Sequence, residues 1–237
     1  MPYWNRAAAL TRSLDAYRKV YPDLDLEFSI ADDGSAEKPI VPQRNPKYKV
    51  TTLPRKARAM NPCVPINAAI RAATSDIIVL TNPEIEHREP VLQSMLAALQ
   101  STDDYVMTGC RNVGFTRRSD LRTQPSGEWI AGPDAPRAPV GGRQPIPPGT
   151  YLHFCVMFHR SLWERVGGFD EEYRKGVGCD DNDWLWSLYA LGDVNFTYVP
   201  GVVWHHLGTR CMWHESVAKN ADRLREKWGH MKEFQCA

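Results

Sequence analysis

The chain has 237 residues, a length that supports one sizeable hydrophobic core or at most two small ones. Hydrophobic residues make up 43% and charged residues 24%, as in ordinary globular proteins, and a net charge of +1 gives no general attraction for nucleic acid. No apolar run is long enough to cross a membrane and the start lacks a signal-peptide core, so we expect a cytoplasmic protein without a transmembrane segment. Six scattered cysteines without a Cys-x-x-Cys pair favour reduced thiols.

Helices and strands alternate through the first half of the chain. Leu10, Leu14, Tyr17 and Val20 repeat on one face and predict a helix over 6–20, before an apolar run that ends in an Asp-Gly turn. The same patterning predicts further helices over 64–73 and 89–101 and strands over 47–53, 75–82 and 105–111. This alternation is typical of an α/β protein with a mainly parallel central sheet flanked by helices.

The second half begins with an expected flexible loop over 112–150, in which the proline and glycine content of residues 122–149 excludes regular structure. A strand over 151–160, a helix that stops at a glycine pair, strands over 194–206 and a final amphipathic helix over 215–231 follow. We therefore expect a single domain over 1–237. Its parts are a nucleotide-binding half over 1–111, the flexible loop over 112–150, and an acceptor half over 151–237.

Polar side chains follow two of the predicted strands. Asp32 and Asp33 end the strand before the Asp-Gly turn, and ligands of open α/β sheets bind at such strand ends. Asn82, Glu84 and Glu86 follow the strand over 75–82, and oxygen ligands in such an alternating pattern suit a hard divalent cation that bridges phosphates. Each pattern is equally typical of a solvent-exposed turn or of a polar strand end that caps the next helix.

A histidine pair, His205 and His206, ends the last predicted strand, where imidazole can complete a Mn²⁺ or Mg²⁺ site. A histidine at a strand end is more often only hydrogen-bonded. Cys211 and His214 add a zinc alternative, although the spacing matches no closed zinc pattern.

Three acidic residues, Asp180, Asp181 and Asp183, begin a predicted helix directly after the sequence Gly-Val-Gly-Cys. One aspartate is explained by helix capping. Three within four positions repel one another and raise the proton affinity of at least one of them. A carboxylate in this position can act as a general base toward an acceptor hydroxyl, so capping and catalysis both stay open.

Taken in chain order, these stretches resemble a GT-A (Rossmann-like) glycosyltransferase of the family-2 type. The sequence PYWNR at 2–6 resembles the family's P-x-x-N-R, and ADDGS at 31–35 its uridine-binding turn. The run NPCVPINAAIRAATSDIIVLTNPEIE resembles the segment that leads to its DXD motif. FHRSLWERVGGFDEEY and GCDDNDWLWSLYALG resemble a galactosyltransferase-like GGFDE and ED-type C-terminal segment. Only Met1 precedes P-x-x-N-R, so the family's first strand is missing or shortened here.

The resemblance implies roles for residues at the donor side. Asp32 and Asp33 would contact the nucleobase of a nucleotide sugar, expected to be UDP-linked, and Pro2 and Asn5 would line the same end. Asn82 is expected to help bind this donor. Glu84 would bind a divalent cation, Mn²⁺ or Mg²⁺, with His205 or His206 as a further ligand.

The resemblance also implies roles for residues at the acceptor side. Asp181 would be the catalytic base, with Asp180 as its acidic neighbour in contact with the acceptor, and Asp170, Glu171 and Trp184 would shape the acceptor site. For Trp184 and Trp186, packing of the helix onto the sheet is the competing interpretation. The expected reaction is an inverting, metal-dependent transfer of a sugar from a nucleotide sugar to a hydroxyl group.

Other functions fit the residues less well. A sugar-nucleotide nucleotidyltransferase would have a glycine-rich phosphate loop where this chain has Asn-Arg-Ala-Ala. A degenerate domain that only binds a sugar nucleotide or a glycan remains the alternative to an enzyme. The acceptor can be a glycan, a protein side chain or a modified nucleic acid such as DNA with a hydroxylated base, for which the loop arginines Arg117, Arg118, Arg122, Arg137 and Arg143 would supply phosphate contacts. The oligomeric state is not indicated by the sequence.

Overall fold

The computed structural model describes residues 1–42, 47–54, 61–113, 154–206 and 214–230. Three parallel strands form one sheet in the order β1-β2-β3: β1 (Pro2–Tyr3), β2 (Phe28–Asp32) and β3 (Tyr48–Thr52). Five strands form the second sheet in the order β4-β7-β6-β8-β5: β4 (Ile77–Thr81), β7 (Cys155–His159), β6 (Asp104–Val113), β8 (Asn195–His206) and β5 (Ile85–His87). The α/β class and the single domain of GT-A type are as expected.

Strand direction differs between the two sheets. The small sheet is wholly parallel, as predicted, but in the large sheet only β6 and β8 run parallel, and β4, β7 and β5 pair antiparallel with their neighbours. The expectation of a mainly parallel sheet is therefore met by the small sheet, whereas the large sheet is mixed. In particular, β7 pairs antiparallel with both β6 and β4.

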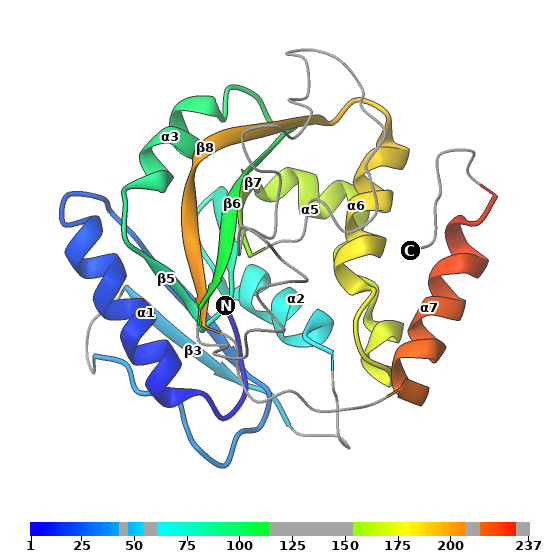
Figure 1. Ribbon diagram of the computed structural model, residues 1–237, viewed down its shortest axis with the longest axis horizontal. Coiled ribbons are helices and arrows are strands. Elements are labelled where there is room, and N and C mark those ends of the chain that lie inside the picture. Colours follow the sequence, from blue (N-terminus) through cyan, green and yellow to red (C-terminus); the bar gives the residue numbers. More distant parts are fainter. Residues whose placement is uncertain (43–46, 55–60, 114–153, 207–213, 231–237) are drawn as a thin grey trace.

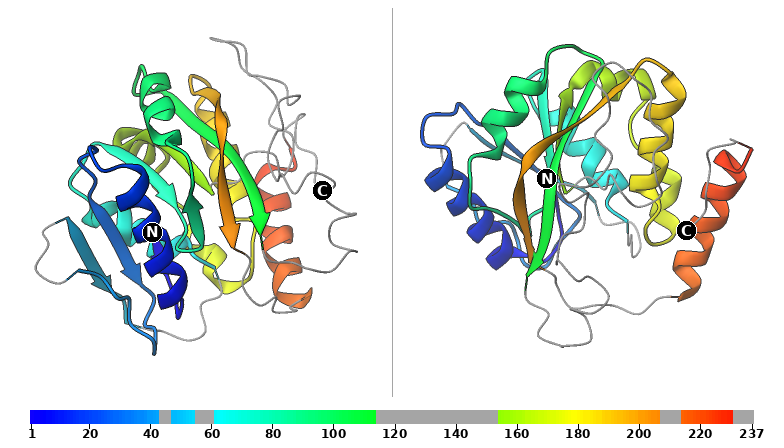
Figure 2. Two further views of the ribbon diagram at one scale, coloured as in Figure 1. Left: turned by 60° about the vertical axis from the view of Figure 1, so that its left-hand side comes forward. Right: turned by 45° about the horizontal axis from the view of Figure 1, so that its top comes forward.

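Helices cover both faces of the sheets (Figure 1). On one face lie α1 (Ala7–Val20) and α3 (Val91–Ala98). On the other lie α2 (Cys63–Ala72), α5 (Arg160–Val166), the short 3₁₀ helix η1 (Glu171–Lys175) and α6 (Asp180–Leu191), and α7 (His214–Trp228) is the outermost helix beside α6 (Figures 1 and 2). Each face has its own buried apolar cluster, as the two-sided burial of a sheet requires.

Most predicted elements form where the periodicity placed them. In α1, Leu10, Leu14 and Tyr17 are buried as a stripe, and Val20 is partly buried. The predicted loop over 112–150 starts slightly too early, because β6 continues to Val113. The rest of that loop, including its five arginines, lies outside the described residues.

Glycine is required by the backbone at two places in the fold. A bulge shifts the β6–β8 register after Thr108, and Gly201 lies there with φ of +130°. A Cβ at Gly201 would lie 2.6 Å from a Val91 methyl group, so α3 packs closely only because position 201 has no side chain. The glycine pair that ends α5 has φ values of +86° and +84°, which excludes continuation of the helix.

Within the described residues, no helix is both long and apolar enough to cross a bilayer. The described cysteines, Cys63, Cys110, Cys155 and Cys179, are free thiols, as the scattered spacing predicts.

Candidate functional site

The turn that is expected to contact a nucleobase follows Asp32, the last residue of β2. The Asp32 side chain is buried, accepts a hydrogen bond of 2.8 Å from the backbone N–H of Ser35, and forms an ion pair of 3.0 Å with Lys38. Burial raises the pKa of Asp32, but the hydrogen bonds from Ser35 and Lys38 outweigh it and hold the pKa below its usual value. Asp32 therefore fixes the turn as an anion, and the partly exposed Asp33 beside it is the residue presented outward.

The P-x-x-N-R segment is tied to this turn. Pro2 is buried in β1 and pairs with Ala31. Asn5, with φ of +48°, accepts a hydrogen bond of 2.9 Å from the Glu37 N–H through its side-chain oxygen, and its own N–H donates to the Ser35 hydroxyl. Pro2, Asn5, Asp32 and Asp33 are thus brought together, as predicted.

The candidate metal ligands come from the edge between β5 and β8. Ile85 pairs with His205 across these strands, which places Glu84 beside His205, with 3.7 Å between the Glu84 carboxylate and Nε2 of His205. The Arg6 guanidinium binds the same carboxylate oxygen. Burial raises the pKa of Glu84, but His205 and Arg6 hold it below its ordinary value, so Glu84 is an anion facing a histidine.

His206 has a different partner. Its Nε2 lies 2.6 Å from the Glu86 carboxylate, which Arg88 also binds at 3.0 Å. The His206 side chain is therefore paired with Glu86, whereas the side chain near Glu84 is that of His205. His87, the residue after Glu86, is buried, and the Tyr21 hydroxyl lies 2.7 Å from its Nδ1.

The donor set of Glu84 and His205 fits a divalent cation that completes its coordination with phosphate oxygens. Within the described residues, no group of three or more His, Cys, Asp or Glu side chains is placed to hold a metal ion. Asn82 begins the turn that carries Glu84, and its backbone carbonyl accepts a hydrogen bond of 3.1 Å from the N–H of Ile85. Cys211, required by the zinc alternative, lies outside the described residues.

The three aspartates at the start of α6 have three different environments. The N-cap residue is Cys179, with φ of +66° and no side-chain capping bond, so none of the three aspartates is the N-cap. Asp181 is partly exposed and accepts a hydrogen bond of 2.9 Å from the N–H of Asn182. It is the aspartate of this group that remains accessible for chemistry.

Asp180 is buried beneath it. The Asn61 side-chain amide donates a hydrogen bond of 2.7 Å to the Asp180 carboxylate and another of 3.1 Å to the Gly178 carbonyl. Burial, and then the negative charge of Asp181, raise the pKa of Asp180 to about 7, although the Asn61 hydrogen bond opposes the shift. At pH 7 the Asp180 carboxyl group is therefore protonated in about half of the molecules.

Asp183 is structural. Its side chain is buried and accepts hydrogen bonds from the Tyr173 hydroxyl at 3.2 Å and from Trp228 Nε1 at 2.8 Å. It also forms an ion pair of 2.9 Å with Lys227. Two of these partners lie in α7, so Asp183 fastens that helix to α6 and η1.

The acidic residues expected at the acceptor floor are also engaged. Asp170 accepts a backbone hydrogen bond from Glu172 and forms an ion pair of 2.6 Å with Arg223 of α7. Glu171 accepts a hydrogen bond of 3.0 Å from the Asn67 side chain. Both lie on η1 or at its N-cap, close to the start of α6.

Trp184 lies in the core. Its side chain is 1% exposed and stacks on Phe169 with 4.5 Å between the ring centroids. Trp186 is also buried and packs near Trp228. The packing interpretation therefore accounts for Trp184, and a direct contact with an acceptor does not fit its burial.

Hydrogen bonds and ion pairs connect the residues expected at the donor side into one group, from the Asp32 turn through Asn5 and Arg6 to Glu84 and His205. In Figure 1 the ends of β6 and β8 lie toward the same side of the molecule as the start of α6 and the start of α2. The Asn61–Asp180 hydrogen bond joins those last two elements. No contact within the described residues joins Asp181 directly to Glu84.

Three residues to which the sequence analysis assigned no role hold these groups in place. Asn61 binds Asp180, and Arg6 neutralises Glu84. Asn67 on α2 accepts hydrogen bonds from the N–H of Phe169 and from Trp163 Nε1, and so anchors the Gly-Gly-Phe segment before η1. The P-x-x-N-R match pointed to Arg6, whereas no sequence pattern distinguishes an anchoring asparagine from an exposed one.

Comparison with known proteins defines the family. A sequence model of glycosyl transferase family 2 matches residues 1–167. The chain belongs to this family. The match ends before α6, so it does not include the three aspartates, and no curated protein sequence matches the chain.

Solved structures share the fold. S. aureus TarS superposes with a TM-score of 0.66 at 15% identity, covering 95% of this chain and 38% of TarS. TarS residues 1–349 in complex with UDP-GlcNAc give 0.66 at 14%, covering 95% and 64%. The mannosyltransferase PcManGT from Pyrobaculum calidifontis, in complex with GDP-Man and Mn²⁺, gives 0.59 at 18%, covering 95% and 62%. The chain thus spans less than two thirds of each of these proteins.

Proposed function

We propose that the chain transfers a sugar from a nucleotide sugar, most readily a UDP-sugar, to an acceptor hydroxyl with inversion at the anomeric carbon. The observation that carries this proposal is the pairing of Glu84 with His205 at the end of β8, next to the Asp32 turn. Membership of glycosyl transferase family 2 supports it, as do the nucleotide sugars bound by TarS and PcManGT.

The donor would lie along the connected group. Asp33, with Asn5 and Pro2 behind it, would meet the nucleobase, and Glu84 and His205 would hold a Mn²⁺ or Mg²⁺ ion beside Asn82. When bound, the cation neutralises the negative charge of the departing diphosphate. Arg6 now binds the Glu84 carboxylate, so it either moves aside or adds its own positive charge to the diphosphate site.

The acceptor would be activated at the start of α6. Asp181 is partly exposed and would take the proton from the acceptor hydroxyl as the hydroxyl oxygen attacks the anomeric carbon. Asp180 carries a proton near neutral pH because its pKa is about 7, so it can donate a hydrogen bond to a sugar or water oxygen. Asn61 fixes its orientation.

The test is donor hydrolysis followed by transfer. Purified protein would be incubated with UDP-GlcNAc, UDP-glucose, UDP-galactose or GDP-mannose, with Mn²⁺ or with EDTA, and free nucleotide would be measured. We expect metal-dependent turnover that Asp181→Asn lowers by about 10²–10⁴-fold, the usual contribution of a general base. Asp15→Asn, on the exposed face of α1, is the matched control that should retain activity. Equal turnover with EDTA, or with Asp181→Asn, would contradict the proposal.

A binding module is the second candidate, because Arg6 already pairs with Glu84 and Asn-Pro-Glu replaces an acidic DXD motif. It predicts that a UDP-sugar binds, as measured by calorimetry, while no donor is turned over with any cation.

The acceptor would be identified by mass spectrometry over glycan, peptide and hydroxymethylated-DNA libraries. The net charge of +1 favours a glycan or a protein side chain over DNA. Asp170 and Glu171 would affect acceptor binding only indirectly, because Arg223 already pairs with Asp170 and Asn67 already donates a hydrogen bond to Glu171.

A further inference from the structure

The carbonyl oxygen of Gly178, just before the three aspartates of α6, accepts hydrogen bonds from two asparagine side chains. The amide of Asn61, at the start of α2, lies 3.1 Å from this oxygen, and the amide of Asn220, on α7, lies 2.8 Å from it. The two asparagines are only 3% and 1% exposed. Elements from opposite halves of the chain therefore converge on one backbone atom, and buried amides without such partners would be costly.

The turn that receives these hydrogen bonds has an unusual backbone. Gly178 has φ of +70° and Cys179 has φ of +66°, so two successive residues are left-handed. Glycine adopts this conformation freely, whereas the Cβ of a cysteine comes too close to the following carbonyl oxygen. Such a conformation persists where the surrounding structure holds it. The two amides bind the turn at the residue before the cysteine.

The turn determines how α6 begins. Its N-cap is Cys179 rather than an aspartate, so the backbone of the turn sets the directions of the side chains that follow. Asp180 is directed inward, where the Asn61 amide binds its carboxylate at 2.7 Å, and Asp181 is partly exposed. The Asn61 amide thus binds both the turn and the buried aspartate.

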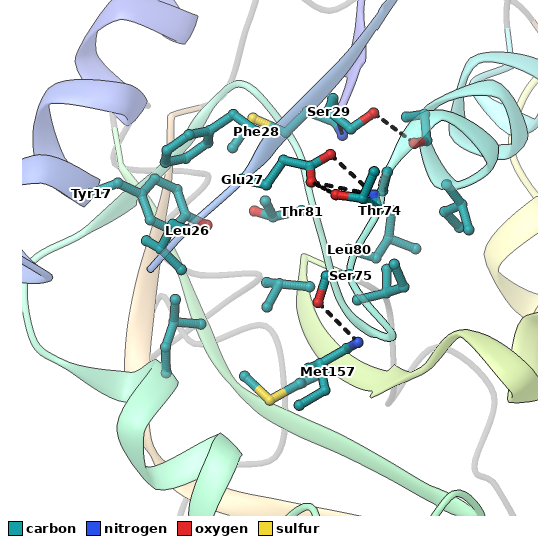
Figure 3. A pocket seen from close by; sticks show the side chains of 18 of the residues that line it. Tyr17, Leu26, Glu27, Phe28, Ser29, Thr74, Ser75, Leu80, Thr81 and Met157 are labelled. Carbon is teal, nitrogen blue, oxygen red and sulfur yellow. Dashed lines mark hydrogen bonds between the residues drawn. The ribbon is translucent and has the colours of Figure 1, made fainter. Parts of the chain in front are cut away.

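Asn61 stands on a firmly anchored helix. Its side-chain oxygen accepts a hydrogen bond of 3.0 Å from the N–H of Cys63, the first residue of α2. At the other end of α2, the Ser29 hydroxyl donates a hydrogen bond of 2.6 Å to the Ala69 carbonyl, and Glu27 accepts one of 3.2 Å from the N–H of the residue at position 74 (Figure 3). These contacts tie α2 to β2, so the support of the turn from this side is fixed.

Asn220 is placed differently from the residues that attach α7. Its amide donates a second hydrogen bond, of 2.9 Å, to the Tyr173 carbonyl at the η1 helix. The attachment of α7 also includes the buried Leu224 and the hydrogen bond of 2.8 Å from Trp228 Nε1 to Asp183. Because the Asn220 amide binds backbone atoms of the segment that leads into α6, its role is separable from attachment of the helix.

We propose that Asn220 is a positioning residue for the transfer reaction: with Asn61 it holds the Gly178–Cys179 turn and thereby presents Asp181 to the acceptor. This inference rests on the proposed role of Asp181 as the catalytic base. Asn220 acts through the turn and makes no contact with the substrate.

Two variants remove the amide. Asn220→Leu has a similar volume, and Asn220→Ala removes the same donors without adding side-chain atoms. Both carbonyls keep another partner, because Asn61 still binds Gly178 and the N–H of Gly176 still binds Tyr173 at 3.1 Å. No buried carbonyl is left without a hydrogen bond, so the variants should fold. Urea unfolding of each variant measures the stability that is lost.

The matched control is Trp228→Phe, which removes one uncharged donor from α7 and keeps an aromatic ring there. Kinetics would use Mn²⁺ and whichever of UDP-GlcNAc, UDP-glucose, UDP-galactose and GDP-mannose the wild type hydrolyses fastest. We expect the Asn220 variants to lower kcat about 10–100-fold, because the base is displaced, with unchanged KM for the nucleotide sugar. The control should keep its kcat. Unchanged kcat in the Asn220 variants, or an equal loss in Trp228→Phe, would overturn the proposal.

The Asp180 carboxyl group reports on the turn without any turnover. Burial raises its pKa to about 7, the charges of Asp181 and Asp183 on α6 act in the same direction, and the Asn61 hydrogen bond opposes them. Cys63 of α2 adds no charge near neutral pH, because burial raises the pKa of its thiol to about 12.

Carbon-13 NMR of the aspartate carboxyl groups measures this titration, and Asp180→Asn identifies the signal by its loss. In the Asn220 variants a relaxed turn exposes Asp180, so its pKa should fall toward the ordinary value, whereas Trp228→Phe should keep the wild-type value. An unchanged pKa in the Asn220 variants would overturn the proposal even where turnover is lost.

The two proposals fail in different ways. If the wild type turns over no donor with any cation, the proposed function fails, and a shifted Asp180 titration would leave Asn220 only a support of the turn. If the wild type is active and the Asn220 variants keep both their kcat and their titration, the positioning role alone is wrong.

Discussion

Asp180 gives the sharpest quantitative prediction, because its carboxyl group is buried between Asn61 and Asp181. Its pKa rises from 3.8 to about 7, roughly three pKa units, and each unit corresponds to about 1.36 kcal/mol. In the unfolded chain the group loses its proton near pH 4, whereas in the folded chain it keeps the proton until about pH 7. The folded state is therefore destabilised progressively between these values, by about 4 kcal/mol above pH 7.

Asp180→Asn removes this ionisation and preserves an oxygen that accepts the Asn61 hydrogen bond. We expect the variant to match the wild type near pH 4 and to exceed its free energy of unfolding by up to about 4 kcal/mol at pH 8. Urea unfolding of both proteins at half-unit steps from pH 4 to pH 8 measures the difference. If variant and wild type differ in free energy of unfolding by the same amount at pH 4 and at pH 8, Asp180 does not have the raised pKa.

The wild-type profile alone does not isolate this effect, because His87 acts in the opposite direction. Burial lowers the pKa of His87 to about 3, so the unfolded chain takes up a proton near pH 6.5 that the folded chain does not. That difference destabilises the protein as the pH falls below about 6.5. Only the difference between wild type and Asp180→Asn isolates the contribution of Asp180 to the pH dependence of stability. Asp181→Asn provides a check, because removal of the neighbouring charge should lower the pKa of Asp180.

Other substitutions test the packing and the candidate metal site. Trp184→Ala removes a fully buried ring from its stack on Phe169 and should lower the free energy of unfolding by about 3–5 kcal/mol, measured by urea denaturation. Asp183→Asn weakens the anchor of α7 and should cost about 1–3 kcal/mol, with faster amide exchange in that helix by mass spectrometry. Arg6→Gln removes the cation paired with Glu84 and should strengthen Mn²⁺ binding in the absence of nucleotide, measured by electron paramagnetic resonance; unchanged or weaker binding would mean that Arg6 does not compete with the metal.

Long, strongly periodic elements were predictable from the sequence, and short ones were not. The stripe Leu10, Leu14 and Tyr17 defines α1, because a helix of this length shows several turns of its apolar face. β1 and β5 have two and three residues and show no period, so neither was predicted as a strand. Strand direction in the large sheet depends on how β7 returns beside β6, and local sequence does not encode it.

The candidate site likewise contains residues that the sequence could indicate and details that it could not. Residue type and position at a strand end identified Glu84 and His205, since the carboxyl ends of strands meet at one edge. The adjacent His206 looked equivalent in sequence, and only the register of β5 and β8 gives it Glu86 as a partner. Among the three aspartates, burial separates the structural anchor Asp183 from the partly exposed Asp181. Burial of a single residue at a helix start depends on contacts from distant elements such as α7.

The most direct test of the proposed function is the position of the metal in crystals soaked with UDP and Mn²⁺, located by anomalous scattering of manganese. We expect one manganese peak, at an ion bound by Glu84, His205 and the diphosphate of UDP, with the uracil near Asp33. A peak at Glu86 and His206, or bound nucleotide without a peak beside Glu84, would contradict it.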